Sequence, residues 1–385
     1  MSSKSLAGPS IARAGRLTAY ELFRSRARRD PEALAIEEGA RRIAYAELDA
    51  RVRRLAGGLA ARGLRRGDRI AVLSENRAEY IEYELAAAHL GLIVACQNWR
   101  LAREELAHCL ALVAPRLLVM SERYASAGRA AAPAGLATLV IERDHEGLLG
   151  EPIEPDPDVD PEDGLVILYT SGTTGMPKGA LISHRAQIAR MAALRLDIRA
   201  DEGDHFVAWA PLFHMASTDQ TYGALMSGAT VIVIDGFRPD AIVDAMARYR
   251  LAWLVLMPGA IEPVIEELRR TGVRPLGVRA LGAMADLLPR AQLAEITRLA
   301  DAPYLNSFGA TETGLPPCSA SLIPPGVLPQ SLSKRQSSLC DIRLLDETGA
   351  DVAPGETGEL AIRGPTVFSG GWAADGVTTR AFAAG

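Results

Sequence analysis

The stretch from residue 168 to residue 179 brings together side chains that are suited to holding an anion. An apolar run, Leu165 to Tyr169, precedes it and predicts a buried strand that ends in a loop. The glycines of the loop let backbone N–H groups approach phosphate oxygens, its hydroxyls add donors, and its lysine adds a mobile positive charge. The expected phosphate ligands are Thr170, Ser171, Gly172, Thr173, Thr174, Gly175 and Lys178.

This loop is not a P-loop of the Walker type. A Walker loop has a glycine, then any four residues, then a Gly-Lys pair, and a Ser or Thr after the lysine. Here two residues separate Gly175 from Lys178, and Gly179 follows the lysine. The nucleotide chemistry expected of this loop therefore belongs to a different motif.

A second cluster of polar and aromatic residues runs from residue 306 to residue 312, where a strand is expected to end. Phe308 could stack on a purine, because every base presents a flat π-face. Thr311 could donate a hydrogen bond to an α-phosphate, and Glu312 could bind Mg²⁺, which prefers one or two carboxylates plus phosphate oxygens. On its own, a Thr-Glu pair could equally open a helix. The candidate nucleotide-binding residues here are Asn306, Ser307, Phe308, Gly309, Ala310 and Thr311, with Glu312 as the metal ligand.

Together the two segments resemble the acyl-adenylate-forming superfamily, which includes acyl-CoA synthetases, peptide-synthetase adenylation domains and firefly-type luciferases. The first is similar to its phosphate-binding signature. The second is similar to its Tyr-Gly-x-Thr-Glu motif, with Phe308 in place of the tyrosine. The resemblance runs from about Leu17 to the end, and it implies ATP and AMP, Mg²⁺ and coenzyme A as cofactors. It also implies catalytic roles for Lys178, Thr311, Glu312 and His214.

Two further segments resemble parts of the superfamily's acyl and adenine pockets. Residues 211–214 are similar to its aromatic/His segment, and residues 282–285 are similar to its Gly-Gly-Ala-Pro turn, with alanine at the second and fourth positions. The turn implies that Gly282, Ala283 and Met284 lie beside the nucleotide. The expected acyl-pocket residues are Trp209, Phe213, His214, Met215, Thr218, Met257 and Gly309, several of which could equally be core residues.

The pattern along the chain predicts an α/β fold. Apolar residues at helical spacing from Leu48 to Leu59 alternate with short apolar strands, as in parallel βαβ units. From Ile342 the strands become short and the turns glycine-rich, so a small β-rich subdomain, a distorted barrel by resemblance, is expected at that end. The expected divisions are a frayed terminus over 1–16, an AMP-binding region of two intertwined subdomains over 17–325, and the β-rich subdomain over 326–385.

Composition narrows the functional class. The 385 residues carry a formal net charge of −5, which gives no reason to expect nucleic acid as a partner. Four scattered cysteines without CxxC spacing favour reduced thiols in a cytoplasmic protein. No uncharged apolar run reaches the length of a membrane span. A small-molecule carboxylic acid or acyl-adenylate is the expected partner, and a homodimer is the ordinary expectation for assembly.

The resemblance implies an acyl-CoA synthetase that forms an acyl-adenylate and passes the acyl group to coenzyme A. The superfamily's C-terminal domain, with its catalytic lysine, has no counterpart before Gly385, so we expect this chain to be the large N-terminal part. Two alternatives stay open: an enzyme that only thioesterifies a preformed acyl-adenylate, and a non-catalytic acyl-adenylate-binding module. A peptide-synthetase domain is less favoured, because Met215 and Ala216 stand where its aspartate is usual, although Asp219 could substitute. The acyl group is expected to be apolar, whether aryl, fatty or polycyclic.

Overall fold

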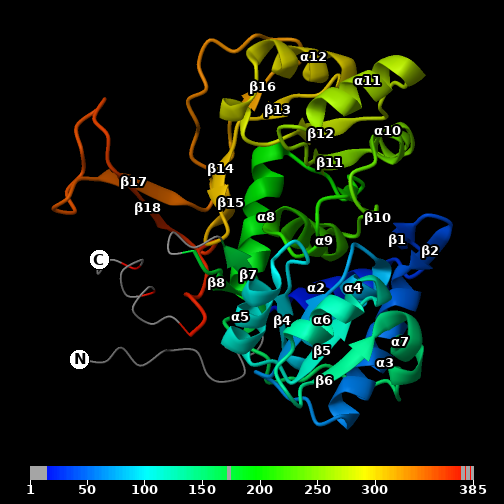
Figure 1. Cartoon of the computed structure of the whole chain (residues 1–385). Helices are drawn as coiled ribbons and strands as arrows, with labels where there is room; N and C mark the ends of the chain where they lie inside the picture. Colours follow the sequence, from blue (N-terminus) through cyan, green and yellow to red (C-terminus); the bar gives the residue numbers. More distant parts are fainter. Residues whose placement is uncertain (1–14, 171–174, 374–377, 379–381, 383–385) are drawn as a thin grey trace.

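The computed structural model describes residues 15–170, 175–373, 378 and 382. Four of the expected phosphate ligands, Ser171, Gly172, Thr173 and Thr174, lie outside the described residues. Figure 1 shows two stacked α/β bodies joined by central helices, with a hairpin that extends to one side.

The largest sheet has six strands, β3 (Arg69–Leu73), β4 (Ile93–Cys96), β5 (Leu117–Met120), β6 (Ala137–Val140), β7 (Gly164–Thr170) and β8 (Lys178–Ser183). Their spatial order is β6-β5-β3-β4-β7-β8, and every neighbouring pair is parallel except the antiparallel hairpin of β7 and β8. This sheet forms the lower body in Figure 1.

Helices cover both faces of this sheet, which explains why its central strands are mostly apolar and buried. They are α3 (Tyr45–Ala61), α4 (Ala78–Leu90), α5 (Arg103–Val113), α6 (Ala125–Ala131) and α7 (Ile141–Leu148), with the short 3-10 turn η1 (Glu122–Tyr124). Successive strand residues point to opposite faces. Accordingly Ile70 and Val72 belong to the core that contains α3 and α4, whereas Ala71 and Leu73 belong to the core under α5.

Two four-stranded sheets complete the scaffold. The first has the order β2-β1-β10-β9 and the second β11-β12-β13-β16. Helices α10 (Pro239–Arg248), α11 (Ile261–Thr271) and α12 (Arg290–Ala300), with the turn η2 (Ala285–Leu287), belong to the upper body in Figure 1. The strands are β1 (Leu34–Glu38), β2 (Arg41–Ala44), β9 (Phe206–Ala208), β10 (Val231–Val233), β11 (Leu251–Leu254), β12 (Val278–Leu281), β13 (Tyr304–Leu305) and β16 (Leu322–Ile323).

Three helices, α2 (Ala19–Arg29), α8 (His184–Ile198) and α9 (Met215–Ser227), pack together near the centre of the molecule. The sequence predicts α8 with Ser183 as its N-cap, and the Ser183 hydroxyl does accept the Ala186 N–H. It does not predict α9. Residues 216 to 226 of α9 are all buried, so the helix carries no polar stripe from which its period could be recognised.

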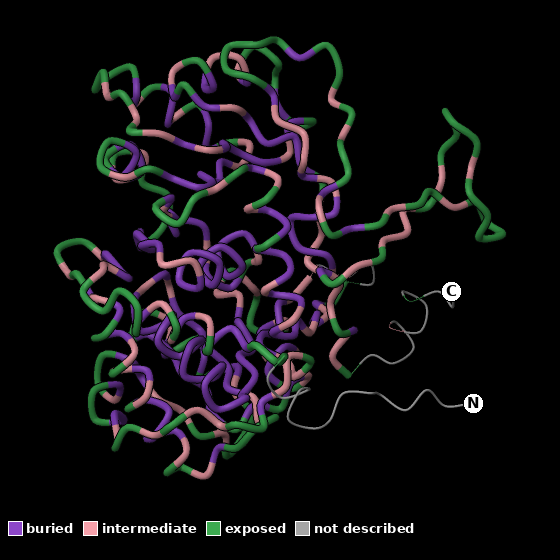
Figure 2. The backbone as a smooth tube through the Cα atoms, turned by 180° about the vertical axis from the view of Figure 1, so that it is seen from behind, coloured by how far each residue is buried: buried purple, intermediate pink, exposed green. Residues whose placement is uncertain are grey.

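Two separate antiparallel pairs of strands complete the fold. They are β14 (Phe308–Ala310) with β15 (Gly314–Cys318), and β17 (Asp341–Leu345) with β18 (Glu359–Arg363). Figure 2 shows the β17–β18 hairpin as mostly exposed or intermediate chain, in contrast with the buried centre. The α/β class is therefore confirmed, with small antiparallel sheets beside the parallel layers. In the described part of the chain, no helix has the length and hydropathy that a membrane crossing needs.

His184 gives the fold a measurable pH dependence. Its ring is fully buried, its Nδ1 accepts the Ala19 N–H at 3.2 Å, and burial lowers its pKa to about 4. Histidine in the unfolded chain has a pKa of about 6.5. The folded state therefore binds fewer protons below that pH, so the stabilisation is fully present above about pH 6.5 and is lost as the pH falls towards 4.

Replacing His184 with glutamine, an uncharged acceptor, should remove this dependence. Between pH 7.5 and pH 5 the wild-type free energy of unfolding should fall by about 2 kcal/mol more than that of the variant. Urea unfolding at the two pH values measures the difference. An equal loss in both proteins would mean that His184 is not the titrating group.

Candidate active site

The first expected ligand segment lies on the hairpin between β7 and β8. Thr170 ends β7 and pairs directly with Lys178, the first residue of β8. Gly175 has a φ of +96° and is exposed, a backbone conformation that favours glycine. Lys178 is half-buried, and the described residues give its ammonium no salt bridge. The hairpin therefore places the Lys178 cation at the start of β8, directly opposite Thr170.

The second segment, residues 306–312, runs through β14 into the tip of the β14–β15 hairpin. Thr311 and Glu312 are half-buried in that tip, and the Thr313 hydroxyl accepts the Ala310 N–H at 3.2 Å. Gly309 pairs with Pro317, and a Cβ at Gly309 would overlap backbone oxygens of β15. The hairpin thus keeps the hydroxyl of Thr311 and the carboxylate of Glu312 on adjacent residues of one short turn.

A single segment, residues 366–372, contacts both motifs through its backbone. Its second half continues the sheet beyond β8: the Leu181 N–H donates to Gly370, and the Trp372 N–H donates to Gly179, at 3.0 and 2.8 Å. Its first half reaches the other hairpin, where the Phe368 N–H donates to the Glu312 carbonyl at 2.8 Å. The strand that carries Lys178 and the turn that carries Glu312 are therefore held against one common segment.

The third expected segment is a turn at the carboxyl end of β12. Gly282 has a φ of +66°, and a Cβ there would overlap the ring of Tyr304. The Tyr304 hydroxyl donates to the Ala283 carbonyl at 2.7 Å and accepts the Ala283 N–H at 3.1 Å. Met284 follows in the left-handed region with a φ of +53°. Because β11, β12 and β13 are parallel, the segments after all three strands meet at one edge, where α/β proteins commonly bind ligands.

Asn306 has a structural role that the sequence analysis does not foresee. Its side-chain NH₂ donates to the carbonyls of Leu332 and Ser333 at 3.1 and 3.0 Å, and its Oδ1 accepts from Lys334 at 2.8 Å. Lys334 also pairs with Asp286 at 2.6 Å. The neighbouring Ser307 is buried as well. Asn306 and Lys334 thus connect the second motif to the turn after β12.

His214 is the N-cap of α9. Its Nδ1 accepts the Ala216 N–H at 3.2 Å, so the neutral ring carries its proton on Nε2 and can donate it to a ligand. Partial desolvation and the nearby Arg100 guanidinium lower the pKa of His214, although solvent still reaches the ring. Arg100 stacks over Trp99 and Phe213, at 4.8 and 5.9 Å from their ring centres. No motif in the sequence indicates this arginine, because one of its two partner rings, Phe213, is far from it in the chain.

The other expected pocket residues differ in how they are engaged. The Trp209 indole N–H donates to the Val255 carbonyl at 2.7 Å, and the buried Thr218 hydroxyl donates to the Leu212 carbonyl. Met215 and Met257 are half-buried. Roles in acyl binding therefore stay predictions: the methionines and the buried Phe213 offer apolar surface, whereas the polar atoms of Trp209 and Thr218 are already used.

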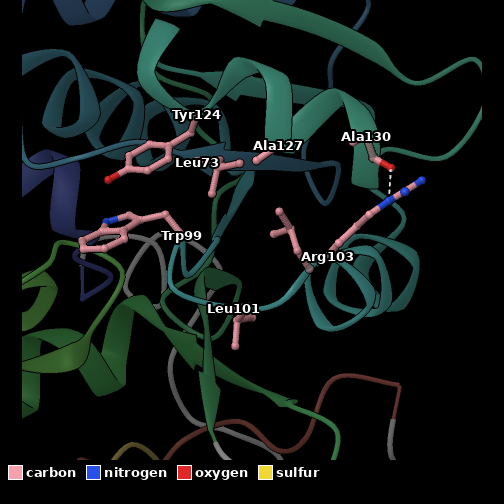
Figure 3. Close-up of a pocket in the computed structure, with 8 residues that line it drawn as sticks. Leu73, Trp99, Leu101, Arg103, Tyr124, Ala127 and Ala130 are labelled. Carbon is pink, nitrogen blue, oxygen red and sulfur yellow. Dashed lines mark hydrogen bonds between the residues drawn. The ribbon is translucent and has the colours of Figure 1, made fainter.

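A small apolar cavity of about 140 Å³ lies beside this region, on the other side of Trp99. Figure 3 shows the Trp99 and Tyr124 rings stacked at one end of the cavity and Arg103 bonded to the Ala130 carbonyl at the other. Trp99 also meets Phe213 edge-on, with 5.7 Å between ring centres. Trp99 is therefore a wall shared by the cavity and the residues around His214.

Phe308 is 44% exposed, so its ring is free to stack on a ligand. Stacking of a base on an aromatic side chain contributes about 1–3 kcal/mol. Replacing Phe308 with alanine should therefore weaken AMP binding about tenfold, as measured by isothermal titration calorimetry. Phe308→Tyr keeps the ring and should bind as the wild type does. Unchanged AMP affinity in Phe308→Ala would exclude the stacking role.

The site suits a Mg²⁺ ion that is bound by one carboxylate and by the phosphate oxygens of a nucleotide. The described residues give the Glu312 carboxylate no hydrogen bond or salt bridge, so its oxygens are available. Within the same residues, no three His, Cys, Asp or Glu side chains gather as a metal cage. Mg²⁺ commonly uses one or two carboxylates and completes its shell with waters and phosphate oxygens, so a single available glutamate fits it.

Comparison with known proteins identifies the family. The AMP-binding enzyme family matches residues 23–372. The chain is 33% identical to an indoleacetate–CoA ligase of Aromatoleum aromaticum, over 89% of this chain and 69% of that protein, and 30% identical to a feruloyl-CoA synthase of an Amycolatopsis species, over 90% and 70%. A crystal structure described as a putative long-chain-fatty-acid CoA ligase from Rhodopseudomonas palustris has a TM-score of 0.86 at 25% identity, covering 96% of this chain and 94% of that one. The chain belongs to the AMP-binding enzyme family, among its acyl-CoA ligases, which are acid–thiol ligases.

Proposed function

We propose that this chain activates an aromatic carboxylic acid with ATP, as a Mg²⁺-dependent acyl-adenylate, for transfer to coenzyme A. The observation that carries the proposal is the shared segment 366–372, which holds the Lys178 strand against the Thr311–Glu312 turn. Lys178 and Glu312, which have no salt bridge within the described part of the chain, are thereby kept on one framework, as a site for the phosphates of a nucleotide and their metal requires.

The proposed chemistry follows from these groups. A carboxylate oxygen of the acid attacks the α-phosphorus of ATP, and the bond to the pyrophosphate oxygen breaks. Negative charge builds up on the phosphate oxygens, where the Lys178 ammonium and the Thr311 hydroxyl can stabilise it. Bound Mg²⁺ would supply further charge neutralisation at Glu312. In the second step the coenzyme A sulfur attacks the acyl carbon, AMP leaves, and the thiol proton passes to solvent.

Two observations support an aromatic acid. Relatives of this chain are named for indoleacetate and ferulate, both of which carry a ring. Phe213 and Met215, the neighbours of His214 in the chain, and the half-buried Met257 offer apolar surface, and the Arg100 guanidinium lies over the Phe213 ring. A flat ring fits beside flexible methionines, because their thioethers adapt to its shape and contact its edge favourably.

ATP–pyrophosphate exchange over a panel of aromatic, aliphatic and polycyclic acids tests the proposal. We expect exchange with aryl acids, little with fatty acids, and a strong loss in Lys178→Ala. Exchange with fatty acids alone would reject the aromatic substrate. No exchange with any acid, together with thioester formation from a synthetic acyl-adenylate, would indicate an enzyme that only thioesterifies. Nucleotide binding without either reaction would indicate a binding module.

A further inference from the structure

Arg190, on α8, is a fully buried arginine whose side chain contacts three separate parts of the chain. Its Nε donates to the Thr366 carbonyl at 2.9 Å, and its Nη2 donates to the Thr311 carbonyl at 3.0 Å. Its Nη1 lies 3.5 Å from an Asp219 carboxylate oxygen on α9. One guanidinium therefore links the tip of the second motif, the shared segment 366–372 and the helix that His214 caps.

Burying this charge is costly. Asp219 is also buried, and burial lowers the pKa of Arg190 and raises that of Asp219. Removing a pair of charges from water is unfavourable, and proteins in which such a pair is replaced by apolar residues are often as stable or more so. Global stability is therefore a weak reason for an arginine here. The planar guanidinium donates hydrogen bonds to two loop carbonyls at fixed angles, and an apolar side chain cannot.

The surrounding backbone is shaped around this side chain. Gly314 has a φ of +74°, and a Cβ there would lie 2.6 Å from the Arg190 Cδ. The Thr311 carbonyl accepts from Arg190, and the next carbonyl, that of Glu312, accepts from the Phe368 N–H at 2.8 Å. Both carbonyls at the tip are thus fixed relative to the segment 366–372, one by a side chain and one by the backbone.

We propose that Arg190 is a positioning residue for adenylation, an inference that rests on the proposed function. It holds the backbone of Thr311 and Glu312 in register with the segment that pairs with the Lys178 strand. A displacement of about 1 Å in such a framework can cost about 100-fold in rate. Arg190 holds this framework through the main-chain carbonyls of Thr311 and Thr366, with Asp219 as its ion-pair partner, and need not touch a substrate.

Arg185, on the same helix, provides a matched control. Its guanidinium donates to the carbonyls of Pro365 and Val367, the neighbours of Thr366. Among the described residues it makes no hydrogen bond to the β14–β15 tip. Arg185→Lys and Arg190→Lys therefore both loosen the same segment and both keep their positive charge. The Thr311 contact is lost only in Arg190→Lys.

Hydrogen exchange of the unliganded chain measures the contact without any activity. In Arg190→Lys, amides of residues 310–314 should exchange at least tenfold faster than in the wild type, while those of α3 and α4 stay unchanged. In Arg185→Lys the 310–314 amides should exchange at the wild-type rate. In ATP–pyrophosphate exchange, kcat should fall at least tenfold in Arg190→Lys and less than twofold in Arg185→Lys. The Mg²⁺ concentration for half-maximal exchange should rise only in Arg190→Lys.

Gly314→Ala is a second test, to be used if Arg190→Lys folds poorly. Its added methyl group displaces the Arg190 side chain and leaves the arginine in place, so the hydrogen exchange and kcat should change as expected for Arg190→Lys. Wild-type exchange at 310–314 in both variants, or the same loss of kcat in Arg185→Lys, would overturn the proposal. If the wild type has no adenylation activity but Arg190→Lys still loosens 310–314, the proposed function fails and the contact stands as structural only.

Discussion

Replacing Glu312 with glutamine is expected to lower ATP–pyrophosphate exchange by about 100- to 1,000-fold. Glutamine keeps the size of the side chain but removes the negative charge, and Mg²⁺ binds an amide oxygen much more weakly than a carboxylate. The described residues give this carboxylate no hydrogen bond or salt bridge, so its loss should leave the fold intact. The thermal midpoint should accordingly change little while the activity falls.

A titration with Mg²⁺ identifies the cause. The Mg²⁺ concentration for half-maximal exchange should rise sharply in Glu312→Gln, and added Mg²⁺ should recover part of the rate. Glu359→Gln, an exposed glutamate on β18, makes the same change in charge away from the motifs and should behave as the wild type does. Glu312→Gln with a wild-type rate and Mg²⁺ dependence would exclude Glu312 as the metal ligand.

The largest loss of stability is expected for Gly282→Ala. The added methyl group would overlap the Tyr304 ring, which is fully buried and held by hydrogen bonds to both backbone groups of Ala283. The Gly282 carbonyl also accepts the Trp253 indole N–H at 2.8 Å, so the turn cannot move aside cheaply. Overpacking together with a positive φ at a residue that has a Cβ should cost about 3–5 kcal/mol.

Gly272 offers the control for this prediction. It has almost the same φ, +64°, but a Cβ there would meet no atom within 4 Å. Gly272→Ala should therefore lose only about 1 kcal/mol, which is the backbone cost alone. Urea unfolding of the two variants separates the clash from the backbone strain. Equal losses would show that Tyr304 yields, and AMP binding by Gly282→Ala would then be expected to persist.

Sequence patterns predicted most of the layered scaffold, because amphipathic helices and apolar strands carry a period that is local. Helix α9 is the instructive omission. It is buried on every side, so its residues show no alternation between apolar and polar faces, and only its packing against α2, α8 and β9 distinguishes it. The segment 211–214 therefore indicated His214 as a candidate site residue. Its position as the N-cap of α9 could not be predicted, because the helix itself could not.

Asn306 and Arg190 show the same limit within the candidate site. The motif predicts Asn306 as a nucleotide-binding residue, and this stays a prediction; only the structure shows that its amide also holds the chain at Leu332 and Ser333. Arg190 has no motif at all, because its partners are the carbonyls of Thr311 and Thr366, and a carbonyl is present on every residue. No spacing of side chains can reveal such a contact across more than a hundred residues.

The sequence by itself determined the chemical groups of this protein: a glycine- and hydroxyl-rich loop with Lys178, an aromatic Thr-Glu segment, and the α/β pattern that carries them. These features are local, since turn conformation, charge and hydrophobic period depend on residues close together in the chain. The tertiary structure decided how the groups meet. Segment 366–372, Tyr304 behind Gly282 and Arg190 behind Thr311 are long-range contacts made by backbone atoms and buried side chains, and only the folded chain brings them together.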